Sequence, residues 1–231
     1  MIVFYSENIN AGVGELSSED SKHCYKVLRK KTGEYISVLD GKGGIHLCEI
    51  EQIEKNRVSF KILESENQEP NVSLPTIGIS LLKNTNRFEW FLEKATELGI
   101  AGIQPVKCAR TLKEKFRKDR AQSIVISAIK QSMRAFLPVV KDLSTIDEVI
   151  SSVEMEQKYI CHYNEENEHL LDVLIPNSPS YILIGPEGDF SDAELRLAVQ
   201  KGWKMVNISE SRLRTETAGI TATNIVSIKN R

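Results

Sequence analysis

A glycine-containing loop, GPEG at 185–188, has residue types that suit ligand binding. It follows an apolar run at 181–184 that predicts a buried strand, and it precedes a capping box, SDAE at 191–194, that predicts a helix start. Ligands of open α/β sheets bind beyond the carboxyl ends of strands, and glycine lets a ligand approach the backbone closely. The loop is therefore a candidate site for an adenine edge or a ribose. It matches neither GxGxxG nor a P-loop, so phosphate binding is not indicated, and a tight turn without a ligand is the alternative.

A second polar segment, SRLRTETAG at 211–219, lies between a predicted strand at 205–208 and a predicted helix at 217–229. Two arginines, a carboxylate and two threonine hydroxyls in one loop are costly to bury without partners. A plain helix start accounts for Thr215 as a cap and Glu216 as a favourable charge, but it gives Leu213 and Arg214 no role. The segment is the second candidate site.

The cysteines and histidines carry no recognisable metal or disulfide pattern. Four cysteines occur singly without a C-x-x-C pair, which predicts reduced, buried thiols: Cys24, Cys48, Cys108 and Cys161. Four histidines have no metal-ligand spacing: His23, His46, His162 and His169. We expect no metal site.

Composition is typical of a soluble globular chain, with 41% hydrophobic and 27% charged residues in 231. The longest apolar stretches are far shorter than the roughly 20 residues that cross a bilayer. The first residues lack the basic and apolar regions of a secretory signal. We expect no membrane segment and a cytoplasmic location.

Positive charge is concentrated although the net charge is −2. Residues 107–141 contain ten basic and two acidic residues, a local charge of +8, so the rest of the chain carries −10. A second basic block, with no acidic residue, spans 22–31. Such runs are often solvated faces, but local positive charge also suits an RNA backbone. We predict RNA contacts at Arg29, Lys30, Arg110, Arg117 and Arg134.

The pattern of elements divides the chain in two. Short strands at 35–39, 45–50 and 57–63 predict a small barrel, with a helix at 18–30 capped by Ser18. A polar segment at 64–71, closed by proline, is the best linker candidate. Strands and helices then alternate, which predicts a parallel sheet with helices on both faces. The expected strands are 76–82, 103–106, 159–162, 181–184 and 205–208, and the expected helices are centred on Phe88–Leu98, 121–135, 192–201 and 217–229.

The two candidate loops together resemble a known signature. IGPEG at 184–188, followed about 25 residues later by LRTETA at 213–218, resembles the RsmE family of bacterial 16S ribosomal RNA (uracil N3) methyltransferases, of the SPOUT superfamily. His23-x-x-x-Val27-Leu28-Arg29 and Asp40-Gly41 resemble the family's PUA-like RNA-binding barrel. KATELG at 94–99, with Pro105 and Arg110, resembles its first helix and second strand.

The resemblance implies a PUA-like β-barrel over 1–70 and a SPOUT α/β domain over 74–231 with a trefoil knot. Sequence physics alone predicts an unknotted doubly wound sheet. The resemblance also implies a homodimer that acts on 16S ribosomal RNA, within the small ribosomal subunit, with S-adenosylmethionine as cofactor. Implied cofactor contacts are His162, Ile184, Gly185, Pro186, Glu187, Gly188, Ile208, Leu213, Thr215, Thr217 and Ala218.

Methyl transfer to uracil N3 needs alignment, loss of the N3 proton and stabilisation of charge on the uracil. Arg214 is expected to stabilise negative charge on a uracil oxygen. Glu216 or Glu187 is expected to accept a proton or to position the cofactor. Two positions depart from the family pattern: Asp189 replaces a common glycine, and Lys130 replaces a common glutamate.

Two other functions are compatible with parts of the sequence. An RNA-binding protein without catalysis would explain the basic blocks and the barrel, but not the two loops. A small-molecule enzyme that uses a nucleotide would explain the sheet, but not the missing phosphate motifs and the separate barrel. Failure to bind S-adenosylmethionine would favour the first, and lack of RNA affinity the second.

Overall fold

The computed structural model describes residues 2–230, which form two compact units. The first unit runs to Pro70 and takes in Ile126–Leu137. The second comprises Asn71–Val125 and the chain from Pro138 onwards. The chain therefore crosses between the units near the end of the predicted linker, within the helix α3 Lys118–Ser132, and again after Leu137.

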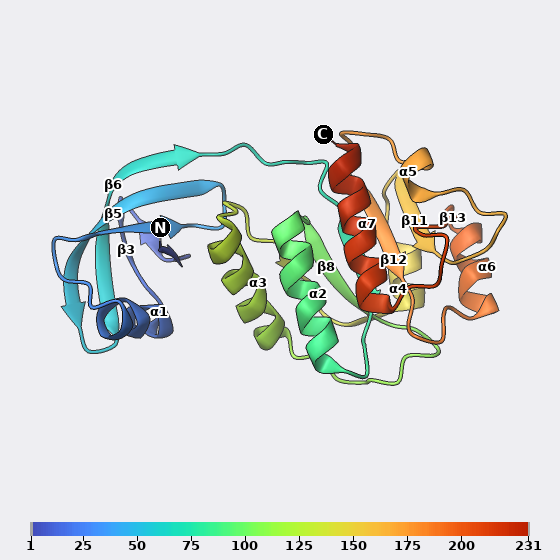
Figure 1. The fold of residues 1–231 in the computed structure, drawn as a ribbon, viewed down its shortest axis with the longest axis horizontal. Helices are drawn as coiled ribbons and strands as arrows, with labels where there is room; N and C mark the ends of the chain where they lie inside the picture. Colours follow the sequence, from blue (N-terminus) through green and yellow to red (C-terminus); the bar gives the residue numbers. More distant parts are fainter. Residues whose placement is uncertain (1, 231) are drawn as a thin grey trace. The chain divides into compact units, whose positions relative to one another are not determined.

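The first unit is a curled six-stranded sheet in the order β1-β4-β5-β6-β3-β2 (Figure 1). Only the β1–β4 pair is parallel. Alternate residues of the strands point inwards, so Phe4, Val38, Ile50 and Phe60 form a fully buried core. The strands are β1 Val3–Tyr5, β2 Ile9–Asn10, β3 Val13–Glu15, β4 Tyr35–Leu39, β5 Gly44–Glu54 and β6 Arg57–Asn67.

The helix predicted over 18–30 is shorter and less regular than its sequence pattern indicates. Ser17, not Ser18, caps α1 Ser18–Lys22, because its side chain accepts the Asp20 backbone N–H. The chain continues as a π-helix, η1 His23–Val27. Arg29 then takes a left-handed conformation, with φ of 56°, which ends the helical path.

The predicted linker begins too early. Residues 64–67 belong to β6, where Glu64 pairs with Leu47 and Asn67 with Gly44. Backbone pairing with the long strand β5 outweighs the low strand propensity of these exposed polar residues.

The second unit is built on a parallel sheet in the order β10-β8-β7-β12-β11-β13, with β9 also paired to β8. The predicted parallel sheet is confirmed. Its strands are β7 Thr76–Ser80, β8 Gly102–Lys107, β9 Val139–Val140, β10 Ser144–Thr145, β11 Gln157–Cys161, β12 Ser180–Ile184 and β13 Lys204–Val206.

Helices cover both faces of this sheet, as predicted. α2 and α7 pack side by side (Figure 1), and α7 also packs on β7. α4 and α6 contact each other and bury Tyr181 and Leu183 of β12 on the opposite face. The helices are α2 Thr85–Leu98, α3 Lys118–Ser132, α4 Ile146–Ser152, α5 Leu170–Val173, α6 Asp192–Gln200 and α7 Thr215–Lys229. Within residues 2–230, no helix is long and apolar enough to span a membrane.

Some elements differ from the sequence-based expectation. α3 ends at Ser132 rather than at 135, because Met133 takes a left-handed φ of 55°. The short strands β2, β3, β9 and β10 and the helices α4 and α5 were not predicted from the sequence. The start of α4 could have been predicted, because Thr145 and Glu148 have the spacing of a capping box.

The C-terminal path sets the geometry of the candidate loops. β13 lies beyond β11 and β12 from β7, yet α7, which follows β13, packs on β7 and α2. The segment between β13 and α7 must therefore cross back over the ends of two strands. It carries the polar residues 207–214.

Close packing of α7 on α2 yields a stability prediction at Gly219. A Cβ there would lie 2.6 Å from Phe91 Cε2 and 3.2 Å from Ile79 Cδ1, and both side chains are fully buried. We expect Gly219→Ala to lower the free energy of unfolding by about 1–2 kcal/mol, because overpacking outweighs the gain in helix propensity. Urea denaturation measures the change. Asn224→Ala, on the exposed face of α7, is the control and should leave stability unchanged or slightly raised. A stabilised Gly219→Ala variant would contradict the packing.

Candidate active site

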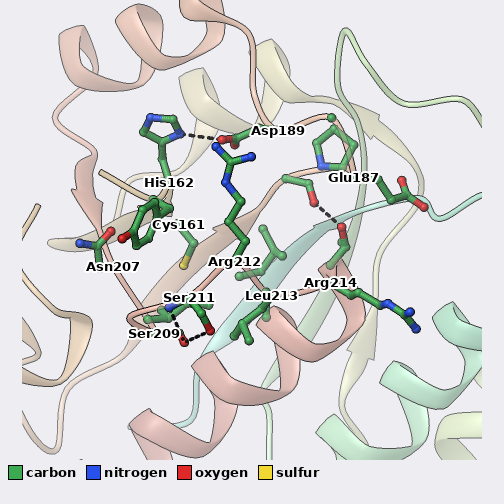
Figure 2. Close-up of a pocket in the computed structure, with 18 of the residues that line it drawn as sticks. Cys161, His162, Glu187, Asp189, Asn207, Ser209, Ser211, Arg212, Leu213 and Arg214 are labelled. Atoms are coloured by element: carbon green, nitrogen blue, oxygen red, sulfur yellow. Dashed lines mark hydrogen bonds and ion pairs between the residues drawn. The ribbon is translucent and has the colours of Figure 1, made fainter. Parts of the chain in front are cut away.

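Three strand ends and the start of α7 enclose a cavity of about 600 Å³ (Figure 2). Its walls come from the ends of β11, β12 and β13 and from the crossing segment before α7. Cys161 ends β11 and His162 follows it, the GPEG loop follows β12, and Leu213 and Arg214 precede α7. Both loops selected from sequence therefore line one cavity.

The GPEG loop is held from the β8 side by Arg110. Arg110 Nη1 donates to the carbonyl oxygens of Gly188, at 2.7 Å, and Phe190, at 3.2 Å. A Cβ at Gly188 would lie 3.3 Å from Arg110 Cδ, so glycine allows the arginine to pass close to the loop. Arg110 thus supports the cavity wall.

A second contact joins the loop to β11. Asp189 Oδ2 lies 2.9 Å from His162 Nδ1. Asp189 Oδ1 accepts the backbone N–H of Phe190 at 2.8 Å. The unexpected carboxylate at 189 is therefore a fixed part of the cavity wall.

Thr215 joins the two signature loops directly. Its Oγ1 donates to the Gly185 carbonyl at 2.9 Å, and its side chain is buried. The N-cap of α7 is Arg214, without a side-chain capping bond, so the interpretation of Thr215 as a simple cap is wrong. The hydroxyl instead holds α7 against the end of β12.

The structure brings together nearly all the predicted cofactor contacts. Of that set, all except Thr217 line the cavity: His162, Ile184, Gly185, Pro186, Glu187, Gly188, Ile208, Leu213, Thr215 and Ala218. The two predicted catalytic residues lie in different environments. Arg214 lines the cavity, whereas Glu216 is buried outside its lining, 3.5 Å from Arg87 Nε on α2.

The cavity is lined by both charged and apolar side chains. Figure 2 shows His162, Asp189 and the guanidinium of Arg212 towards one end, and Glu187 and Arg214 towards the other. Apolar side chains also line the cavity, among them Ile184, Val206, Leu213 and Ala218. Burial raises the pKa of the Cys161 thiol, which keeps it protonated and unreactive. This lining suits a ligand that has both a flat apolar ring and polar groups.

Sequence reasoning missed several lining residues. Cys161 ends β11 and Tyr163 follows His162, while Asn207 and Ser209 lie in the crossing segment. Asn207 Nδ2 donates to the carbonyls of Asn164, at 2.7 Å, and Asn167, at 3.0 Å, which ties the loop after β11 to the end of β13. These residues could have been found from their position at or just beyond the carboxyl ends of strands, where ligands of such sheets bind.

Ion pairs partly neutralise the basic stretch from the end of β8 to the first turn of α3. Lys107 pairs with Glu114 and Lys118 with Asp142. Arg120 pairs with Glu89 through two bonds, of 3.1 and 2.7 Å. Arg117 is exposed, and the described part of the chain shows no ion pair to it. Arg117 is therefore better placed for RNA than Arg110, which is bound to the GPEG loop.

The predicted RNA contacts of the first unit differ in exposure. Arg29 is exposed, and Lys30 lies 3.7 Å from Glu34. Arg134 is half-buried, and burial lowers the pKa of its guanidinium. Lys130, the second departure from the family pattern, forms a 2.8 Å ion pair with Asp20. That lysine fixes the end of α3 to α1.

Comparison with known proteins places the fold and the cavity in one class. Residues 69–227 match the family model of the RNA methyltransferase domain, and residues 16–63 match that of the RNA methyltransferase PUA domain.

Over the residues that the structure describes, no group of three or more His, Cys, Asp or Glu side chains is arranged to hold a metal ion.

Individual relatives narrow the class. Ribosomal RNA small subunit methyltransferase E of Rickettsia conorii is 30% identical over 90% of this chain and 86% of its own length. The protein of the same name from Aquifex aeolicus is 28% identical, over 98% of this chain and 99% of its own. A crystal structure of ribosomal RNA small subunit methyltransferase E from Neisseria gonorrhoeae, bound to S-adenosyl methionine, is 30% identical with a TM-score of 0.86, covering 96% and 95% of the two chains. The chain belongs to the ribosomal RNA small subunit methyltransferase E family, which confirms the resemblance of its two loops.

The bond between the loops yields a prediction at Thr215. Thr215→Val keeps the side-chain volume but removes the donor to Gly185, so we expect the free energy of unfolding to fall by about 1–2 kcal/mol. Thr217→Val is the matched control, because Thr217 is half-buried outside the cavity lining. Equal losses of stability in both variants, measured by urea denaturation, would contradict a specific role for the Thr215 hydroxyl.

Proposed function

We propose that this chain transfers a methyl group from S-adenosylmethionine to N3 of a uridine in 16S ribosomal RNA. The observation that carries this proposal is the joining of the GPEG and LRTETA loops into one cavity by the Thr215–Gly185 bond. Family membership supplies the substrate class, because the relatives are named as small subunit ribosomal RNA methyltransferases.

The donor set of the cavity fits S-adenosylmethionine. Its apolar lining residues suit the adenine ring, and Asp189 and Glu187 are carboxylates that suit hydroxyl and cationic groups. The arginines suit a carboxylate. We therefore propose as cofactor contacts the lining residues of the predicted set. Thr217 and Glu216 lie outside the lining, and Glu216 supports α7 through its ion pair with Arg87.

When bound, S-adenosylmethionine supplies an activated methyl group. The chain must then align uracil N3, favour loss of its proton and balance the charge that moves onto the uracil oxygens. We propose that Arg214 provides that positive charge, because it lines the cavity at the end shared with Glu187 (Figure 2). Glu216, paired with Arg87, positions the first turn of α7. Glu187 is the carboxylate at the same end that could accept the proton.

The resemblance also carries proposals about the context of the reaction. We propose domain limits of 1–70 and 74–231, a homodimer, a small ribosomal subunit substrate and a cytoplasmic location. We also propose a knotted C-terminus, supported by the passage of residues 207–214 back over two strands. N3 lies on the pairing edge of uracil, so the target uridine must be unpaired or flipped out.

Mass mapping of 16S RNA tests the proposed function directly. Small subunits from cells lacking the protein are incubated with purified protein and S-adenosylmethionine, and the RNA is then mapped. The proposal expects one new methyl group on N3 of a single uridine. RNA that is bound but unmodified would instead favour an RNA-binding protein without catalysis.

Arg214→Ala tests the catalytic proposal. We expect single-turnover methylation to fall about 100-fold or more, the order seen when a group that stabilises transition-state charge is lost. The melting transition should stay nearly intact, because Arg214 is exposed and has no capping bond.

Both ligands must be saturating in that measurement, so that weaker binding does not mimic slower chemistry. Glu216→Gln is the comparison variant and should lose stability as well as rate, because its partner is Arg87. An Arg214→Ala enzyme that methylates at the parent rate would place the charge-stabilising group elsewhere.

Salt dependence tests the RNA surface. Arg117→Gln should reduce the slope of log affinity against log salt by about one unit, because one phosphate contact is lost. Arg120→Gln removes the same charge three residues away, from an arginine already paired with Glu89, and should change the slope much less. Filter binding over a salt series compares the two. Equal slopes in all three proteins would mean that Arg117 is a solvated residue without a phosphate contact.

A further inference from the structure

Asp189 takes a backbone conformation that costs energy for any residue with a side chain. Its φ is 63°, in the left-handed region that glycine adopts freely. Its N–H donates to the Pro186 carbonyl at 2.9 Å, so Asp189 closes the turn that begins at Pro186. A carboxylate at such a position must compensate through its contacts.

The Asp189 carboxylate is held by two hydrogen bonds but keeps acceptor sites without a partner in the protein. Oδ1 accepts the Phe190 N–H, and Oδ2 pairs with His162 Nδ1. An ionised carboxylate has about four acceptor sites, so two stay available. The Asp189 side chain lines the cavity and is 46% exposed, so these sites are open to a ligand.

His162 needs this contact to hold its own orientation. Its ring lines the main cavity and also a second cavity of about 520 Å³ beside α6, so packing alone does not fix it. The 2.9 Å bond to Asp189 holds the ring and the carboxylate together as a pair. The pair forms one end of the main cavity, opposite Glu187 and Arg214 (Figure 2).

We propose that Asp189 recognises the two neighbouring hydroxyls of the ribose of the cofactor, and that His162 positions the Asp189 carboxylate. This inference rests on the proposed function. If the methyl group is transferred towards the Arg214 end of the cavity, the ribose of the cofactor lies towards the Asp189 end. Two adjacent hydroxyls can donate to the free acceptor sites of one carboxylate, a recurrent way for proteins to bind ribose.

Calorimetric titration with three ligands tests the inference. S-adenosylhomocysteine carries both the ribose hydroxyls and an amino acid ammonium group. Its 2′,3′-dideoxy analogue lacks the hydroxyls, and 5′-methylthioadenosine lacks the ammonium group. Asp189→Gly restores the residue best suited to the turn, and Asp189→Asn keeps an acceptor for the Phe190 N–H. Glu165→Gln, an exposed acid outside the cavity lining, controls for net charge.

We expect Asp189→Gly to bind S-adenosylhomocysteine and 5′-methylthioadenosine about tenfold more weakly than the parent, and the dideoxy analogue equally well. Asp189→Asn should melt like the parent and lose part of the same discrimination. His162→Ala should reduce the discrimination, and His162→Gln, which keeps a donor, should recover it. Glu165→Gln should match the parent with every ligand.

Other outcomes overturn the inference in distinct ways. An equal loss for all three ligands would mean that Asp189 only supports the turn. A loss for the dideoxy analogue but not for 5′-methylthioadenosine would mean that Asp189 binds the ammonium group instead. Failure of the parent to bind S-adenosylhomocysteine at all would overturn the proposed function itself, which separates the two failures.

Discussion

The hydrogen bond from Thr215 to the Gly185 carbonyl, at 2.9 Å, is the interaction on which the candidate site depends. It joins two loops that are 30 residues apart in sequence. Without it, the loop that follows β12 and the loop that precedes α7 would be two unconnected strand-to-helix loops. With it, the apolar and polar groups of both loops face one cavity. Because the donor and the acceptor are largely withdrawn from water, loss of either would leave the other costly to bury.

That bond forms only because α7 returns across the sheet. β13 lies at the far side of β11 and β12, and the close fit of Gly219 against Phe91 and Ile79 fixes α7 over β7. The segment between β13 and α7 is thereby drawn over the strand ends, with Arg212 and Arg214 in it. Arg110 and the Asp189–His162 pair then hold the GPEG loop from its other sides. Core packing outside the cavity lining therefore sets the positions of its charged groups.

The sequence was most informative where local chemistry and position agree. Both loops, the parallel sheet and most cavity residues could be predicted, because glycines, hydroxyls and charges cluster after apolar strands. Glu216 and Arg110 show the limit: their partners, Arg87 and the Gly188 carbonyl, are more than 75 residues away in the chain. The end of α1 was missed because a π-helix has no distinct residue pattern. The start of the linker was misplaced because strand pairing outweighed the polar composition of 64–67.

The central claim is that the two signature loops form one cofactor site. Hydrogen exchange measured by mass spectrometry, with and without S-adenosylmethionine, tests it most directly, because bound ligand slows exchange where it contacts or orders the backbone. We expect protection to appear together in residues 184–190 and 207–218, and Thr215→Val to weaken it in both. Protection confined to one loop, or located along α6 or in the first unit, would contradict it.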